Sequence, residues 1–242
     1  MRRLTTILVI SLWLPLFGGV HTLDNGLTVI VKQLPGSPVV SIWYGIKTGS
    51  GYEEGLYGTG ISHYVEHLVG DGTEHYTKAQ IDSIKEALGG MANAYTTKEL
   101  TCYYITVSEE HLRAALDLLT EEVFRSTIPQ EAVDMQRGII LKEILQNLDE
   151  PEDRLYQLMM RALFLDMPMR YPTIGYTELF KGITRDELIA YYRKHYVPNN
   201  AILAIAGDVD EGEVLNIVDE IVGTIKPGRY VYKPIPAEPA PP

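Results

Sequence analysis

A chain of 242 residues is long enough to bury a hydrophobic core, as one large domain or two small ones. Its 21 Lys and Arg stand against 32 Asp and Glu, and the formal net charge of −11 argues against a nucleic-acid binder, because no basic surface stands out to neutralise phosphates. The single cysteine, Cys102, excludes an intramolecular disulfide and a cysteine-rich zinc site. Any metal must therefore be held by His and carboxylate side chains.

The first twenty residues have the pattern of a targeting segment. A short basic start, MRR, precedes an apolar stretch from Leu4 to Val20 that has no charged side chain. This pattern is typical of a secretory signal peptide and predicts an exported protein, either periplasmic or secreted. The sequence LFGGV lacks a clean small-x-small cleavage pattern, so an uncleaved membrane anchor stays open as an alternative. A first core strand or helix is the other alternative.

Strands are expected next, beginning with a hairpin. The turn Asp24–Gly26 separates HTL from LTVIVKQ, which is a hairpin pattern. Three further apolar stretches predict strands: VVSIWYGIKTGS from Val39, TCYYITV from Thr101 and AILAIAGD from Ala201.

Helices are expected between these strands. Thr77 with Gln80 forms a capping-box pattern at a helix start, and Pro129 suits the first turn of a long helix that reaches about Asn147. Hairpins combined with runs of helices predict an α+β fold, with a mainly antiparallel sheet packed with helices.

The C-terminal stretch has a different composition. From Lys226 to Pro242 the chain reads KPGRYVYKPIPAEPAPP, in which six of the seventeen residues are proline. Such a stretch favours extended polyproline II conformation and is common in linkers between domains. The sequence therefore predicts a signal peptide or anchor at 1–20, a folded domain at 21–225 and a proline-rich linker or tail at 226–242.

One short stretch carries candidate metal chemistry. In ISHYVEHLVG, His63 and His67 are four residues apart and Glu66 immediately precedes the second histidine. On a helix these residues share one face, so two imidazoles can bind one zinc ion while the glutamate accepts a proton from a metal-activated water. This His-x-x-Glu-His order is the reverse of the commoner zinc-protease motif. The alternative for the five letters alone is a solvated amphipathic helix.

A third ligand is offered by Glu143, which follows His67 with 75 residues between them. It lies on the long helix expected after Pro129, where Ile139, Ile140 and Ile144 would hold one face against the core and direct the carboxylate inward. The alternative is a surface residue, because glutamate is a good helix former.

A family resemblance draws these observations together. The matching stretches are LDNGLTVIV, KTGSGYEEGLYGTGISHYVEHLVGDGT, IKEALGGMANAYTTKELTCYYITV, IILKEI and YYRKHYVPNNAILAIAGDVD. In order and spacing, over about residues 21 to 225, they resemble the N-terminal catalytic half of an M16 zinc metallopeptidase, the group that includes pitrilysin, insulinase and the mitochondrial processing peptidase. The resemblance implies that His63, His67 and Glu143 bind one Zn²⁺ per chain and that Glu66 is the catalytic base.

The resemblance also implies roles for other residues. In the family, the strand edge equivalent to MANAYTTKELT pairs with the backbone of a peptide substrate, which points to Asn93 and Ala94 as substrate contacts. A plain sheet strand is the alternative for these two positions. Many members carry a glutamate seven residues before the third ligand. Here that position is Gln136, which can hydrogen-bond a ligand but brings no negative charge.

Three functional hypotheses follow. The first is a zinc-dependent endopeptidase that hydrolyses peptides or unfolded segments and works with a second homologous half, in cis or as a separate subunit. In the resembled family that half contributes an Arg and a Tyr to substrate or transition-state binding. The second is a non-catalytic scaffold or assembly subunit with the same fold. The third is a zinc-binding fragment that is inactive without its partner. No nucleic-acid partner is expected, and contact with a membrane is expected only through an uncleaved N-terminal segment.

Overall fold

The computed structural model describes residues 18–235 and 237–239. The expected signal segment at 1–20 therefore lies almost wholly outside the described residues. Among the residues that are described, no helix combines the length and the apolar character needed to cross a bilayer.

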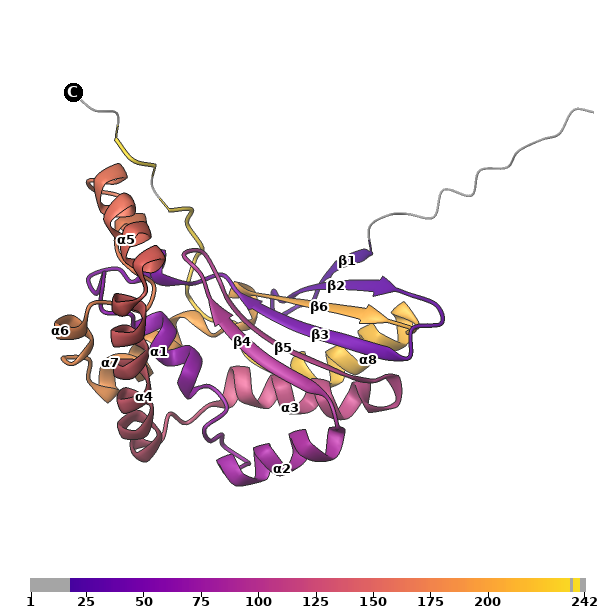
Figure 1. Ribbon diagram of the computed structural model, residues 1–242. Coiled ribbons are helices and arrows are strands. Elements are labelled where there is room, and N and C mark those ends of the chain that lie inside the picture. The colour runs from indigo at the N-terminus through magenta and orange to yellow at the C-terminus, as the bar shows by residue number, and fades with distance from the viewer. Residues whose placement is uncertain (1–17, 236, 240–242) are drawn as a thin grey trace, which may run out of the picture.

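A single mixed sheet organises the fold (Figure 1). Within the described residues it has six strands in the order β1-β2-β6-β3-β5-β4. β2 and β6 pair in parallel, whereas the other four neighbouring pairs are antiparallel. The predicted α+β fold with a mainly antiparallel sheet is confirmed. The strands are β1 (Gly19–Thr22), β2 (Thr28–Gln33), β3 (Val39–Ile46), β4 (Met91–Thr96), β5 (Thr101–Ser108) and β6 (Ala201–Gly207).

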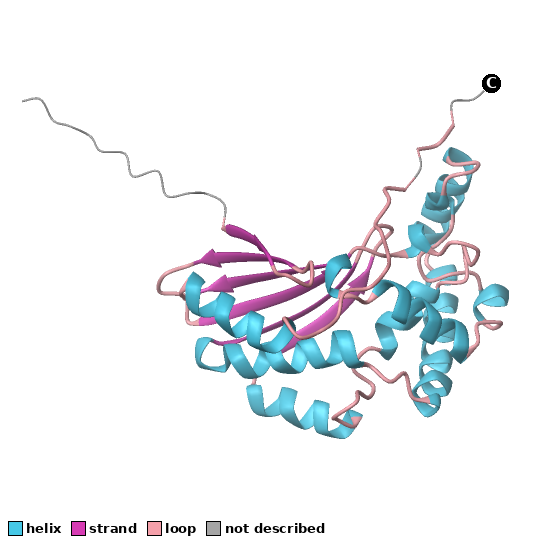
Figure 2. Cartoon of the chain, turned by 180° about the vertical axis from the view of Figure 1, so that it is seen from behind, coloured by secondary structure: helices cyan, strands magenta, loops and turns pink. Residues whose placement is uncertain are grey.

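The helices form two groups around this sheet. Three of them, α2, α3 and α8, lie along one face of the sheet, and the others gather at one end of it (Figures 1 and 2). The helices are α1 (Ile61–Leu68), α2 (Lys78–Leu88), α3 (Leu112–Arg125), α4 (Gln130–Asp149), α5 (Pro151–Leu163), α6 (Thr177–Phe180), α7 (Arg185–His195) and α8 (Glu211–Val222). The strand β4 is at the edge of the sheet nearest to the second group.

The core lies between the sheet and the helices that cover it. Along β3, alternate residues are fully buried, as expected for a strand with one face against helices. Tyr44 is 0% exposed, and its hydroxyl hydrogen-bonds to Thr120 Oγ1 of α3 at 2.9 Å, so this buried polar group has a partner. Fully burying a large apolar side chain contributes roughly 1.5–3 kcal/mol, so this layer supplies much of the stability of the sheet.

Several local predictions are confirmed. The two strands around Asp24–Gly26 form the expected antiparallel hairpin. Thr77 caps α2 through a reciprocal capping box with Gln80. The long helix predicted after Pro129 is α4, and Pro129 is its N-cap residue.

The entry into α1 is fixed by a close backbone contact. Its N-cap residue is Gly60, which has a φ of +76°, and a Cβ atom there would lie 2.2 Å from the carbonyl oxygen of Ile174. Next to it, the amide of Tyr176 donates to the carbonyl of Gly58 at 2.8 Å. Only glycine combines this backbone conformation with this approach, so the start of α1 is held against the segment before α6.

The described part of the proline-rich stretch is extended and packs on the domain. The side chain of Asn199 accepts from the amide of Gly228 at 2.7 Å, and the hydroxyls of Tyr52 and Tyr232 are 2.9 Å apart. Further along, the carboxylate of Glu238 accepts from the amides of Leu165 and Met167, at 2.7 and 2.8 Å. This segment therefore crosses the domain from the end of α7 to the loop after α5.

Candidate metal centre

The helix α1 separates apolar side chains from the two candidate metal ligands. Tyr64, Val65 and Leu68 are fully buried on one side of the helix. His63 and His67 lie on the other side, since residues four apart share a helix face. The apolar side holds the helix in the core and leaves both imidazoles directed toward α4.

Glu143 reaches the same place from α4, although not in the way predicted. Ile140 and Ile144 are buried as expected, but Ile139 is 40% exposed, so that part of the prediction is wrong. The reason is geometric, because Ile139 lies on the same stripe as Glu143, one turn away, at the margin of the helix interface. The side chain of Glu143 is 35% exposed and leaves that margin toward α1.

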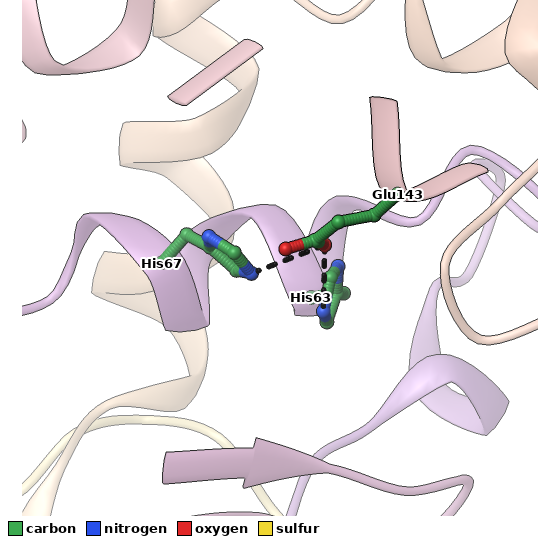
Figure 3. Close-up of side chains that lie close together, drawn as sticks. All are labelled: His63, His67 and Glu143. Carbon is green, nitrogen blue, oxygen red and sulfur yellow. Dashed lines mark ion pairs between the residues drawn. The ribbon is translucent and has the colours of Figure 1, made fainter. Parts of the chain in front are cut away.

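Three side chains converge between the two helices (Figure 3). Oε2 of Glu143 lies 4.0 Å from Nε2 of His63 and 3.6 Å from Nε2 of His67. One ligating atom from each residue lies within 4.8 Å of the other two. Figure 3 shows both histidines extending from one helix toward the carboxylate, which comes from the other.

This arrangement fits a zinc ion. Tetrahedral coordination with bonds of about 2.0–2.2 Å places ligand atoms about 3.3–3.6 Å apart, close to the separations found here. Burial, with a smaller contribution from the charge of His67, lowers the pKa of His63 to about 3. His63 is therefore a neutral imidazole at physiological pH, which is the form that binds a metal.

His67 is oriented by a chain of hydrogen bonds. Its Nδ1 lies 3.1 Å from Oε1 of Gln136, whose amide nitrogen donates to Asp71 Oδ2 at 2.7 Å. Lys78 Nζ lies 3.3 Å from Oδ1 of Asp71. With Nδ1–H donated to Gln136, the lone pair of Nε2 is left for a metal. The structure thus brings Gln136 into contact with a candidate ligand, as an acceptor without charge.

Glu66 lies beside the three converging residues. Its Oε2 accepts a hydrogen bond of 2.5 Å from the hydroxyl of Thr96, the last residue of β4. Burial raises the pKa of Glu66, a shift that the Thr96 hydrogen bond opposes and the negative charge of Glu143 adds to. A carboxylate with a raised pKa is a stronger base than an exposed one.

The edge strand β4 runs up to Glu66. Asn93 is exposed and Ala94 is half-buried, opposite Tyr104 and Tyr103 of β5. The amide of Ala94 donates to Oδ1 of Asn93 at 2.9 Å, so a peptide that uses this amide must first displace the Asn93 side chain. Both residues therefore lie on a sheet edge that leads to the candidate metal centre formed by His63, His67 and Glu143.

A cavity of about 420 Å³ borders His63. Its lining includes Lys98 from the β4–β5 turn and Tyr156 and Met160 from α5. Burial lowers the pKa of Lys98 to about 8, and its ammonium donates to the carbonyl of Tyr171. A larger cavity of about 790 Å³ lies along the C-terminal segment, and its lining includes none of the metal-cluster residues.

Sequence reasoning did not identify several residues of this region. Thr96 hydrogen-bonds to Glu66 and Asp71 to Gln136, and in each pair the two residues are at least 30 positions apart in the sequence. Lys98 lines the cavity beside His63. No spacing pattern along the chain marks such contacts. The capping box at Thr77 is a local pattern, and it could be predicted from the sequence.

Comparisons with known proteins point to one family. The family model of insulinase, peptidase family M16, matches residues 28–176, and the model of the M16 inactive domain matches residues 182–242. An uncharacterized zinc protease of Mycobacterium leprae is 35% identical over 205 residues, which are 84% of this chain and 45% of that protein. The uncharacterized zinc protease YmxG of Bacillus subtilis is 30% identical over 197 residues, or 81% of this chain and 48% of that one. The chain spans less than half the length of these relatives.

Solved structures show the same fold. A protease from Helicobacter pylori matches with a TM-score of 0.82 and 26% identity, over 91% of this chain and 52% of that chain. The periplasmic protease PqqL from Escherichia coli matches with a TM-score of 0.81 and 24% identity, over 91% of this chain and 26% of that one. The matched family model covers more than half of the sequence and includes α1 and α4. The chain therefore belongs to the insulinase family of zinc proteases, peptidase family M16.

Proposed function

We propose that this chain is the catalytic half of a zinc-dependent endopeptidase, in which His63, His67 and Glu143 bind one Zn²⁺ and Glu66 is the general base. The observation that supports this most is the convergence of three ligating atoms within 4.8 Å from two helices, with the half-buried carboxylate of Glu66 beside them. The substrate class is peptides or unfolded segments, because the cluster lies at a sheet edge rather than in a closed pocket.

Each residue of the site has a defined task in this reaction. Bound Zn²⁺ supplies Lewis-acid chemistry, polarising a carbonyl and lowering the pKa of water. Glu66 takes a proton from the attacking water on one carboxylate oxygen while Thr96 holds the other, and it then returns the proton to the leaving amine. Gln136 keeps the ring of His67 in the orientation and tautomer that leave Nε2 free to bind.

The substrate is proposed to lie along β4. An extended peptide can add to the exposed edge at Asn93 and Ala94, and this would carry its backbone toward Thr96 and Glu66 at the end of the strand. The cavity beside His63 is then available to a substrate side chain, with an apolar wall from Tyr156 and Met160.

Two other functions compete with this one. A non-catalytic scaffold would retain the fold, and the match of residues 182–242 to the M16 inactive domain is the observation in its favour. A zinc-binding fragment without activity is the other. Zinc content separates the scaffold from the other two, and activity with and without a second half separates the enzyme from the fragment.

Loss of any ligand should abolish tight zinc binding. His63→Ala, His67→Ala or Glu143→Ala each leaves two protein ligands for an ion that prefers three and a water, and we expect affinity to fall by more than about 100-fold, since losing an orienting partner alone costs 10–100-fold. Elemental analysis after dialysis measures this, with His111→Ala, on the turn before α3, as the control. Stoichiometric zinc in the three variants would rule out this ligand set.

Glu66→Gln should retain zinc and lose hydrolysis. The amide keeps the shape of the side chain but cannot accept the proton, so the rate should fall by about 10²–10⁴-fold. Turnover of an unstructured peptide by the zinc-loaded variant is the measurement, and Glu86→Gln on the exposed side of α2 is the control. Near-normal turnover by the Glu66→Gln protein would show that another group is the base.

A second M16-like half, in cis or as a separate subunit, is proposed to complete the site. The relatives are about twice as long as the matched region, and the solved protease from Helicobacter pylori is covered to 52%. We expect this chain alone to bind zinc but to cleave peptides feebly, and addition of a homologous half that carries the family's Arg and Tyr to raise the rate. Full proteolytic activity of the verified monomer would contradict the need for that half.

Export to the periplasm or the medium is proposed from the basic and apolar start of the chain, which lies outside the described residues up to position 17. Cell fractionation with intact-mass analysis of the recovered protein tests this. An exported protein that keeps residues 1–20 would identify them as an anchor, and a cytoplasmic protein would contradict export.

A further inference from the structure

The metal-binding helix α1 has no cap of its own. Its N-cap position must be Gly60, because of the positive φ and the contact with Ile174 described above, so no side-chain oxygen is available there. The first amide groups of any helix need acceptors from outside the helix. The amide of Ile61 reaches Thr59 Oγ1 at 3.3 Å, and the next amide, of Ser62, needs another acceptor.

Glu53 supplies that acceptor from the loop before α1. One of its oxygens, Oε1, accepts from the amide of Ser62 at 3.0 Å and from the Ser62 hydroxyl at 2.6 Å. The side chain of Glu53 is almost completely buried, with the residue 1% exposed. Ser62 immediately precedes His63, so these two hydrogen bonds hold the first turn of α1 next to a candidate ligand.

This carboxylate is costly to bury. Its second oxygen, Oε2, makes no hydrogen bond of ordinary geometry among the described residues. Burial raises the pKa of Glu53 to about 7, a shift that the hydrogen bonds from Ser62 and the backbone of Gly60 oppose. The positive charge of Lys98 also opposes this rise in pKa, although its ammonium donates to the carbonyl of Tyr171. Burying a carboxyl group that has one unpaired oxygen lowers the stability of a fold unless other interactions offset that cost. The hydrogen bonds of ordinary geometry that the Glu53 side chain makes are those to Ser62, so its role is to be found there.

The two histidines differ in how their rings are held. His67 is oriented by Gln136, whereas Nδ1 of His63 is buried and has no partner among the described residues. With no hydrogen bond to orient its ring, His63 depends on the backbone of the first turn of α1 for its placement. That turn is the one bound by Glu53.

We propose that Glu53 is a positioning residue of the metal centre: by holding Ser62 it fixes the first turn of α1 and so places His63 for zinc. This inference rests on the proposed zinc site. It assigns Glu53 no contact with substrate or metal.

A matched pair of variants tests this proposal. Glu53→Asp withdraws the carboxylate by one methylene from Ser62 while keeping its charge. Glu187→Asp does the same at α7, where Glu187 accepts from the amide and hydroxyl of Thr184 in the same way. We expect zinc affinity, measured by competition with a chelator, to fall 10–100-fold for Glu53→Asp and less than about twofold for Glu187→Asp. Glu53→Gln, which keeps an oxygen acceptor at the same distance along the side chain, should retain most of the wild-type zinc affinity.

Hydrogen exchange on the zinc-free protein supplies a second readout. The amide of Tyr64, which bonds to the carbonyl of Gly60, should exchange at least about tenfold faster in Glu53→Asp than in the wild type, while the amides of α7 stay unchanged. Weakened zinc binding together with this faster exchange supports the proposal. Either effect without the other, or neither, overturns it. If the wild-type protein binds no zinc, the proposed function fails as well. That outcome differs from failure of the Glu53 inference alone, in which the wild-type protein still binds zinc.

Discussion

The packing of Tyr64 between α1 and α4 is the interaction on which the metal cluster depends. The Tyr64 side chain is fully buried, and its hydroxyl donates to the carbonyl of Val133 in α4 at 2.5 Å. Its ring lies 4.9 Å from that of Phe180 and beneath the guanidinium of Arg137. His67 and Glu143, which are 76 positions apart in the sequence, can bind one ion only if the two helices keep a fixed separation, and the packing of Tyr64 helps to hold it. A rigid, packed scaffold is what a preorganised metal centre requires.

Charge around the cluster is arranged in layers. Glu143 and Glu66 supply negative charge next to the proposed cation site, and the charge of Glu143 disfavours ionisation of Glu66 while no cation is bound. The residue that supports His67 is the neutral Gln136, and the negative charge of Asp71 is one step further out, paired with Lys78. A carboxylate at position 136 would add a third negative charge directly against a ligand. The amide therefore orients His67 with less electrostatic influence on a bound metal than a glutamate would have.

Local patterns made much of the fold predictable. The hairpin at Asp24–Gly26 and the capping box at Thr77 each depend on residues only a few positions apart, and both formed as expected. The misplacement of Ile139 shows the limit of such reasoning, since helical periodicity identifies a stripe but not where a neighbouring helix stops covering it. Glu53 was missed for a related reason. Nothing in the sequence distinguishes a glutamate in a glycine-rich loop that caps a helix nine residues later from one that is solvated.

The candidate site lies on one side only of the proposed peptide path along β4, and this follows from the elements that form the site. The proposed zinc ligands and base come from α1 and α4, and the candidate peptide edge comes from β4, all within one domain. Glu143 remains 35% exposed, and the strand edge beside it is open to an incoming chain. Peptide hydrolysis gains from donors preorganised for the developing oxyanion and from exclusion of water, each of which needs groups on the far side of the substrate. A site open in this way can bind its metal without help, but a peptide lying on β4 would still face solvent. The proposed need for a second half therefore follows from where α1, α4 and β4 meet.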